Sequence, residues 1–327
     1  MKKYRIFIVV SVILALTALL CLPACYGGGD TGTDSPSEGL KFTANADNTF
    51  SVAGRGACTD KHIVIPKTTP NGYAVTGIAD EAFKGDAELV GVSIPQHIKS
   101  IGAKAFYGCY NMTDVVIDYG VTTVGEEAFM LCKRLQQITL PESVTHIGDR
   151  AFSYSDKLVY VTIPNSIQYL GDKVFEFCYS LEYTQHEGVC YLGNSTNPNL
   201  ILAKVNDVSV SSCVISPSTK FIDYHAFKDC TRLMEITLPE GLKSIGYEAF
   251  WNCRCIGYVT IPSSVVRIES SAFAGTDLAD AWFMSPEGWK VTVDDASGIR
   301  DIDVGDLTDP QNAAFCLKNA PGVWTKN

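Results

Sequence analysis

The 23 residues from Leu135 to Lys157, LQQITLPESVTHIGDRAFSYSDK, contain the pattern on which most of the chain is built. Their phenylalanine recurs along the sequence, usually after an alanine, and successive copies are 23 residues apart except for one longer step. The copies are Phe83, Phe106, Phe129, Phe152, Phe175, Phe227, Phe250 and Phe273. A period of this length is typical of stacked structural repeats, so we expect a solenoid.

Other apolar residues keep a fixed distance from the phenylalanine. A leucine, methionine or isoleucine comes six residues later, then a valine or isoleucine, then an aliphatic residue that is usually followed by proline. This segment predicts a short strand, which proline ends because it has no N–H to donate. The IG pair predicts a tight turn, and the AFxxC stretch predicts a short helical or 3₁₀ return. Stacking about nine or ten such coils would build one elongated apolar core.

One repeat is interrupted. The step from Phe175 to Phe227 is 52 residues, which is two periods plus six, so an insertion lies between them. The sequence from Tyr191 to Lys204, YLGNSTNPNLILAK, predicts a hairpin that protrudes from the regular surface, within an insertion over about residues 185–207. The register of the repeat resumes afterwards, so we expect no separate domain there.

The consensus LxxVxIPxxVxxIGxxAFxxC resembles the leucine-rich repeat of BspA-like bacterial surface proteins, also called the Treponema-type class. The resemblance covers roughly residues 40–283. It implies a leucine-rich-repeat solenoid, a β-rich α/β right-handed superhelix of short parallel strands with a β-hairpin insertion and a C-terminal cap. Cys58 to Pro66 resembles the family's opening repeat, and residues 284–327 resemble its closing segment.

The closing segment also has its own pattern. Alternation at Trp289, Val291 and Val293 predicts edge strands, and Trp282 and Phe283 with Trp289 would cover the exposed end coil. A separate cell-wall or carbohydrate-binding module is the alternative.

The first residues predict export. A basic start, Lys2, Lys3 and Arg5, precedes an apolar run from Ile6 to Leu22, so residues 1–24 read as a signal peptide. LPAC, ending at Cys25, resembles a bacterial lipobox, although Pro23 replaces the usual small residue. This resemblance implies lipidation of Cys25, and the alternatives are ordinary cleavage or a retained anchor. Residues 25–39, rich in glycine, serine and aspartate, predict a flexible tether. We therefore expect a bacterial cell-surface or envelope protein that meets the membrane only through its lipid anchor.

Charge and motifs narrow the class of function. The net charge of −10 argues against nucleic acid as an electrostatic partner. The sequence has no Walker loop, nucleophile elbow or dinucleotide fingerprint. Its five histidines occupy different repeat positions, and Cys253 with Cys255 has the wrong spacing for zinc. We expect no enzyme, no cofactor and no metal.

Several of the twelve cysteines share one repeat position, three residues after the phenylalanine. They are Cys109, Cys132, Cys178, Cys230 and Cys253. We interpret them as a buried ladder of free thiols rather than as disulfides, because their parallel Cβ directions disfavour closure. Cys213 falls on the buried valine position of its strand and is interpreted as core.

Outward strand positions are the candidate binding surface. The position four residues before the proline is the most varied, and a rigid sheet with mixed aromatic, acidic and amide groups suits protein recognition. Its candidate residues are Asp114, Gln137, Tyr160, Tyr183, Glu235 and Tyr258. The alternative is that the tyrosines only pack against one another as cross-strand neighbours. The inserted hairpin around Gly193 to Asn199 is a second candidate site.

The family resemblance implies adhesion to a protein partner, which would be a host extracellular-matrix protein or another cell-surface protein. An envelope scaffold, or a structural protein that binds polysaccharide, is the alternative.

Overall fold

The computed structural model of the chain describes residues 35–295, 298–302, 307–320 and 322–326. Pro36–Asn327 form one compact unit. The expected signal peptide, Cys25 and most of the tether lie outside the described residues. The last tether residues are part of the fold, because Ser37 is buried and exchanges hydrogen bonds with Val64. Among the residues described, no helix is both long and apolar enough to cross a membrane.

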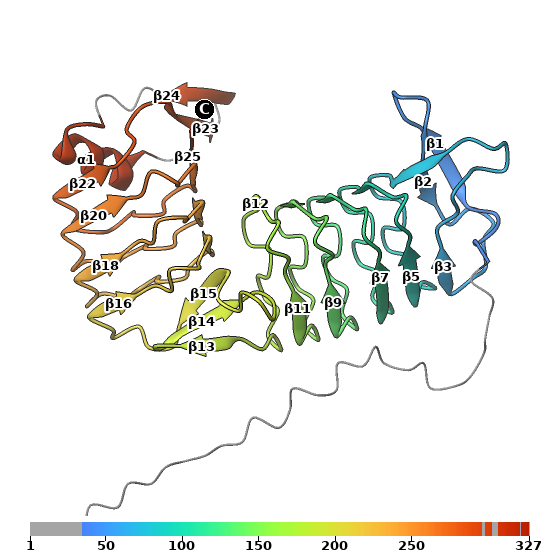
Figure 1. Cartoon of the computed structure of the whole chain (residues 1–327), viewed down its shortest axis with the longest axis horizontal. Coiled ribbons are helices and arrows are strands. Elements are labelled where there is room, and N and C mark those ends of the chain that lie inside the picture. Colours follow the sequence, from blue (N-terminus) through green and yellow to red (C-terminus); the bar gives the residue numbers. More distant parts are fainter. Residues whose placement is uncertain (1–34, 296–297, 303–306, 321, 327) are drawn as a thin grey trace, which may run out of the picture. The chain divides into compact units, whose positions relative to one another are not determined.

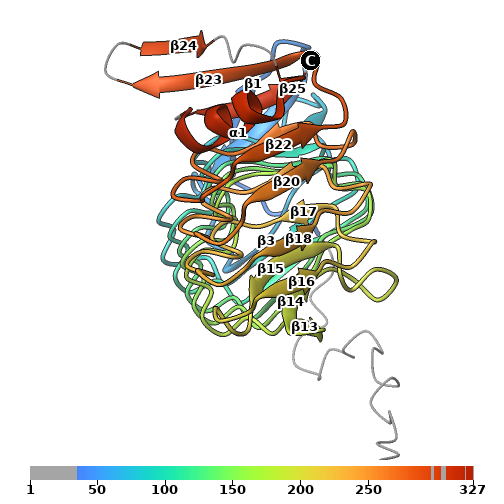
Figure 2. The same ribbon diagram turned by 90° about the vertical axis from the view of Figure 1, so that its left-hand side faces the viewer.

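The predicted LxxVxI strands are present and form a first strand row along the solenoid. Strands from successive coils pair in parallel, as between Tyr160 and Gln137, which are one repeat apart. Figures 1 and 2 show the members of this row side by side in each half of the solenoid. They are β3 (His62–Val64), β5 (Gly91–Ile94), β7 (Asp114–Ile117), β9 (Gln137–Thr139), β11 (Tyr160–Thr162), β16 (Ser212–Val214), β18 (Glu235–Thr237), β20 (Tyr258–Ile261) and β22 (Asp280–Phe283).

A second strand row, which the sequence did not predict, runs just before the IG turns. Its strands also pair in parallel from coil to coil, as between His146 and Tyr169. The row begins with β1 (Lys41–Ala44) and β2 (Phe50–Gly54), which are antiparallel to each other, and continues in parallel. Its other members are β4 (Val75–Ile78), β6 (Ser100–Ile101), β8 (Thr123–Val124), β10 (His146–Ile147), β12 (Tyr169–Leu170), β17 (Phe221–Ile222), β19 (Ser244–Ile245) and β21 (Arg267–Ile268).

The AFxxC stretches are consecutive turns, so the expected helical or 3₁₀ return is wrong. Lys104 and Gly108, on either side of Phe106, both have left-handed backbone with φ near +57° and +68°. Such residues interrupt a right-handed helix. The backbone bonds to the next coil instead, as where Phe106 N–H donates to the carbonyl of Ala128 at 2.8 Å.

The phenylalanines form the predicted buried column. Each is at most 5% exposed, and neighbouring rings within each half are stacked with centroids 4.9 to 5.6 Å apart. The solenoid of short parallel strands is therefore confirmed.

The cysteine ladder is also confirmed as buried free thiols. Four of its members donate from Sγ to the phenylalanine carbonyl of the preceding coil, at 3.0 to 3.4 Å. Ser155 takes the same position in its coil and makes the same bond to Phe129 at 3.1 Å. Cys213 is buried in its strand, as expected.

The insertion differs from the expected hairpin. It contains three antiparallel strands, β13 (Thr184–His186), β14 (Val189–Leu192) and β15 (Ile201–Val205), and β15 then pairs in parallel with β17. Tyr191, Leu192 and Leu202 are buried, so the hairpin is part of the wall and does not protrude as a whole. The apolar core also divides here into two clusters, which corrects the expectation of one continuous core. Figure 1 shows the insertion between β11 and β16.

The C-terminal segment covers the last coil. β25 (Val323–Lys326) pairs with β21 and with β23 (Trp289–Asp295), and β24 (Gly298–Ile302) completes the hairpin. Trp289 and Phe283 are buried with Trp324, as expected of a cap, whereas Trp282 is 42% exposed and does not contribute as predicted.

The helix α1 (Pro310–Asn319) belongs to the same cap. Its N-cap is Asp309, whose carboxylate accepts from the N–H groups of Gln311 and Asn312, and Pro310 occupies its first turn. Ala313, Ala314 and Leu317 are its buried residues. In Figure 2 the helix lies next to β22.

Candidate binding groove

Three of the six predicted site residues lie together on the first strand row. Asp114 on β7, Gln137 on β9 and Tyr160 on β11 are all exposed. They line a groove of about 360 Å³, which we call the strand groove. Its other lining residues are Thr113, Gln136 and Val159. The parallel register places Gln137 beside Tyr160, and β7 lies next to β9, which brings Asp114 to the same groove.

A second cavity, the insertion pocket, begins where the strand groove ends. It has a volume of about 390 Å³ and shares Tyr160 with the strand groove. Val161 of β11 and residues 182–184 line it from the repeat, and residues 191–195 with Pro198 line it from the insertion. The two sites predicted separately, the strand face and the inserted hairpin, therefore meet at Tyr160.

The loop that closes the insertion pocket is held in place by side-chain amides. Asn194 donates from Nδ2 to the carbonyl of Ile163 at 2.7 Å, and its Oδ1 accepts from the N–H of Thr196 and of Asn197. Asn165 adds a bond to the hydroxyl of Thr196 at 2.8 Å. These bonds hold the wall of the pocket in one conformation.

Tyr160 is the side chain that the strand groove and the insertion pocket share. It is 57% exposed, although it belongs to a regular strand. A hydrogen bond with the Glu182 carboxylate, together with its charge, raises the pKa of Tyr160. The ring therefore presents an apolar face beside a carboxylate.

Tyr183 lines the insertion pocket, but it is less exposed than the other five predicted residues. It is half-buried against the first core cluster, and burial raises the pKa of its phenol. The chain leaves the first strand row at this point to form β13, whose three residues are all exposed, so Tyr183 turns inward. Lys204 covers its ring, with Nζ 4.6 Å from the centroid.

Glu235 and Tyr258 are exposed on β18 and β20, in the half of the solenoid after the insertion, and line neither cavity. The ring of Tyr258 meets Trp282 edge-on at 6.2 Å. The alternative that the three tyrosines pack against one another fails for Tyr258, which contacts Trp282 in the other half, whereas Tyr160 and Tyr183 line the same pocket.

Sequence reasoning missed Glu182 and Thr184 as site residues. The signal was present in LEYTQH, residues 181–186, where Thr184 and His186 stand at the two positions that bury aliphatic side chains in other coils. Polar residues there predict that this strand leaves the row, and that a recess opens beside β11.

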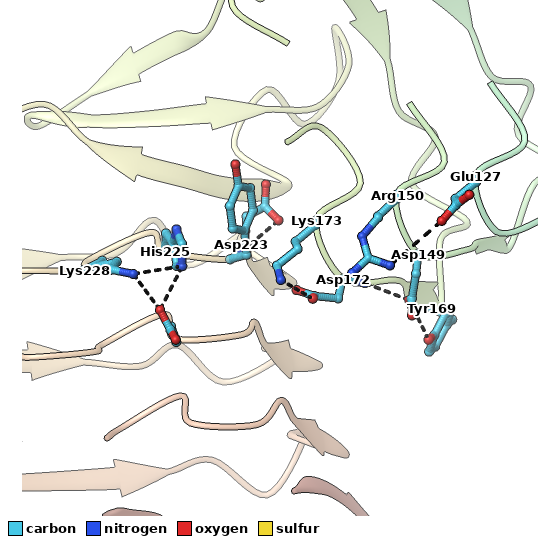
Figure 3. A network of polar contacts seen from close by, with 11 residues as sticks. Glu127, Asp149, Arg150, Tyr169, Asp172, Lys173, Asp223, His225 and Lys228 are labelled. Carbon is cyan, nitrogen blue, oxygen red and sulfur yellow. Dashed lines mark hydrogen bonds and ion pairs between the residues drawn. The ribbon is translucent and has the colours of Figure 1, made fainter. Parts of the chain in front are cut away.

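A polar network follows the phenylalanine turns on both sides of the insertion (Figure 3). Before the insertion, Asp149 accepts from the backbone N–H of Asp172 at 2.9 Å, and Lys173 pairs with Asp172 at 3.8 Å. After it, Glu248 pairs with Lys228 at 2.6 Å and with His225 at 3.0 Å.

Two cation–π contacts cross between the halves, in addition to a hydrogen bond from Lys220 Nζ to the carbonyl of Asn165 at 2.8 Å. The guanidinium of Arg267 lies 5.1 Å from the ring centroid of Tyr169, and Lys173 Nζ lies 4.2 Å from that of Tyr247. These cation–π contacts join coils that no strand pairing connects.

The network contains one buried acid, Asp223, and one half-buried acid, Asp172. Burial, with the charge of Asp172 nearby, raises the pKa of Asp223 to about 7, and burial raises that of Asp172 to about 6. A pair of carboxyls can serve acid–base catalysis. Asp223 is only 6% exposed, however, so a substrate would not reach its carboxylate. Within the described part of the chain, no group of three or more His, Cys, Asp or Glu side chains could hold a metal ion.

Comparisons with known proteins agree with the repeat geometry. The family model described as BspA type leucine rich repeat region matches residues 58–195 and 205–290, in six copies. A comparison with curated proteins found no match.

Several solved structures of leucine-rich repeat proteins are similar to this chain. The T. pallidum leucine-rich repeat protein TpLRR is 25% identical over 68% of this chain and 90% of its own, with a TM-score of 0.46. A leucine-rich cell surface protein from Faecalibacterium prausnitzii is 22% identical over 78% of this chain and 89% of its own, with a TM-score of 0.36. The pneumococcal vaccine antigen PcpA is 20% identical over 76% and 81%, with a TM-score of 0.42. Because these TM-scores are below 0.5, the assignment depends on the repeat sequence and not on these likenesses.

Proposed function

Because this chain belongs to the BspA-type leucine-rich repeat family, we propose that it is a non-catalytic recognition protein of the bacterial surface. It binds a protein partner through the strand groove and the insertion pocket. The partner is an extracellular-matrix protein or another cell-surface protein, and the chain is attached to its own cell by a lipid on Cys25.

The observation that carries this proposal is the position of Tyr160 between two adjoining cavities. Its ring is exposed on a rigid strand, and exposed tyrosines at the centre of a shaped surface are frequent energetic anchors of protein interfaces. Asp114 and Gln137 supply polar groups along the groove, and Glu182 supplies a carboxylate beside the ring.

Binding of labelled matrix proteins to intact cells that display the full chain tests the proposal. Tyr160→Ala should weaken binding at least tenfold, because losing such an anchor costs about 1.4 kcal/mol or more. The matched control is Tyr258→Ala, an exposed tyrosine at the same repeat position in the other half, which should bind as the wild type. Cys25→Ala should release the chain from the cells without changing its affinity.

Two results would contradict this function. One is binding to polysaccharide but to no protein, which would support the structural alternative. The other is equal loss in the Tyr160→Ala and Tyr258→Ala chains, which would place the interface elsewhere.

A further inference from the structure

The first strand row has an open edge at β11. On one side β11 pairs with β9, through Tyr160↔Gln137, Val161↔Ile138 and Thr162↔Thr139. Among the described residues no strand pairs with the other side, because the next segment, β13, pairs with β14 in antiparallel fashion instead. Pairing along this row is also interrupted between β7 and β9 and between β18 and β20, and what distinguishes the edge at β11 is the insertion pocket that lies beside it.

The chain itself occupies the two positions that flank this gap. The N–H of Glu182 donates to the carbonyl of Val159 at 2.9 Å, and the N–H of Ile163 donates to the carbonyl of Gly193 at 3.1 Å. Between these two bonds only Val161 remains.

The direction of the Val161 backbone follows from the ladder. The N–H of Tyr160 donates to Gln136 at 3.2 Å, and the carbonyl of Thr162 accepts from the N–H of Leu140 at 3.1 Å, so both residues face the preceding coil. Backbone groups alternate in direction along a strand. The N–H and C=O of Val161 therefore face the open side, where Val161 lines the insertion pocket.

The charged residues of the two cavities favour a positively charged side chain on a bound partner. Among the residues that line the insertion pocket, Glu182 is the only one with a charged side chain at neutral pH. Among those that line the strand groove, Asp114 is the only one. A cation beside Glu182 would also meet the exposed ring of Tyr160, which adds a cation–π contact.

We propose that the insertion pocket is a slot for one extended segment of a partner protein, which pairs with the backbone of Val161 and places a lysine or arginine beside Glu182 and Tyr160. This mode of binding adds a strand to an open sheet edge, with main-chain bonds for affinity and a side-chain contact for selection. It rests on the proposed function, whose recognition surface it specifies.

The probe is the peptide acetyl-TVKVT-amide, titrated into the chain while amide hydrogen exchange is followed residue by residue. Exchange at the Val161 N–H should slow at least tenfold at saturation. The same peptide with its central backbone nitrogen methylated, or with glutamate in place of lysine, should bind at least fivefold more weakly.

Glu182→Gln should raise the dissociation constant for the lysine peptide about fivefold or more, with the Tm unchanged. Glu235→Gln is the matched control, because Glu235 is an exposed acid of the same strand row in the other half, and it should leave binding unchanged.

Unchanged exchange at Val161 under saturating peptide would overturn the proposal, and so would equal effects of Glu182→Gln and Glu235→Gln. Protection of Val161 in a concentration-dependent dimer without peptide would overturn it in favour of a second copy of the chain. If the peptide fails to bind at Val161 while Tyr160→Ala still weakens capture of a matrix protein, the strand-addition mode is wrong and the proposed function stands.

Discussion

Gly148→Ala is expected to lower the free energy of unfolding by roughly 3 kcal/mol, the upper range for overfilling a packed interior. A Cβ at this position would lie 2.5 Å from the backbone nitrogen of Glu126 in the preceding coil, and backbone cannot move aside as a side chain can. The glycine is needed for this close approach and not for its backbone angles, because its φ is outside the left-handed region. Gly125 and Gly171 show the same contact in their coils.

Gly257→Ala is the matched control for this prediction. Gly257 also has φ outside the left-handed region, and a Cβ there would have no heavy atom within 4 Å. Its free energy of unfolding should change by less than about 1 kcal/mol. Urea unfolding of both variants is the measurement, and equal stability of the two would mean that the coils are not in close backbone contact.

Asp223→Asn is expected to stabilise the chain at pH 8 and to flatten its dependence on pH. Because burial raises the pKa of Asp223 from 3.8 to about 7, protonation favours the folded state. The stabilisation that the raised pKa of Asp223 provides is fully present below about pH 4, and it is lost as the pH rises through 7 and the carboxyl ionises in the folded state. A shift of roughly three pH units corresponds to at most about 4 kcal/mol. Asparagine cannot ionise, and its side-chain oxygen can still accept from the N–H of Tyr224.

Thermal unfolding between pH 4 and pH 8 measures this effect. The wild type should lose stability across the range, and the raised pKa of Asp172, about 6, acts in the same direction. Asp118→Asn, at an exposed position, should keep the pH dependence of the wild type. If the wild type is as stable at pH 8 as at pH 5, Asp223 is not buried as an acid.

The columns of the solenoid were predictable because burial imposes a strict period. Phe129 and Leu135 are at fixed places in the repeat, and each is fully buried, as the spacing requires. The second strand row was not predictable in the same way. Pairs such as His146 and Ile147 are too short to show alternation, and only the pairing between coils makes them strands.

The position of the insertion could be predicted from the repeat spacing, but its strand pairing could not. The extra residues between Phe175 and Phe227 revealed its presence, whereas its antiparallel pairing depends on long-range contacts. Tyr183 illustrates the consequence, because the repeat places it outward and the departure of β13 turns it inward.

The site was predicted in part for the same reason. Asp114, Gln137 and Tyr160 follow from the regular register, and they meet in one groove. Glu182 lines the insertion pocket because the insertion loop folds back over β11; the polar residues Thr184 and His186 indicate that the strand leaves the row, but they do not indicate where the loop lies.

Photo-crosslinking of the chain to its bound partner tests the location of the recognition surface most directly. A benzophenone amino acid replaces Gln137 on β9 in one variant and Glu235 on β18 in another, since both are exposed positions of the first strand row. Crosslinking from position 137, and little from position 235, is the predicted result. Efficient crosslinking from position 235 with none from position 137 would contradict the account.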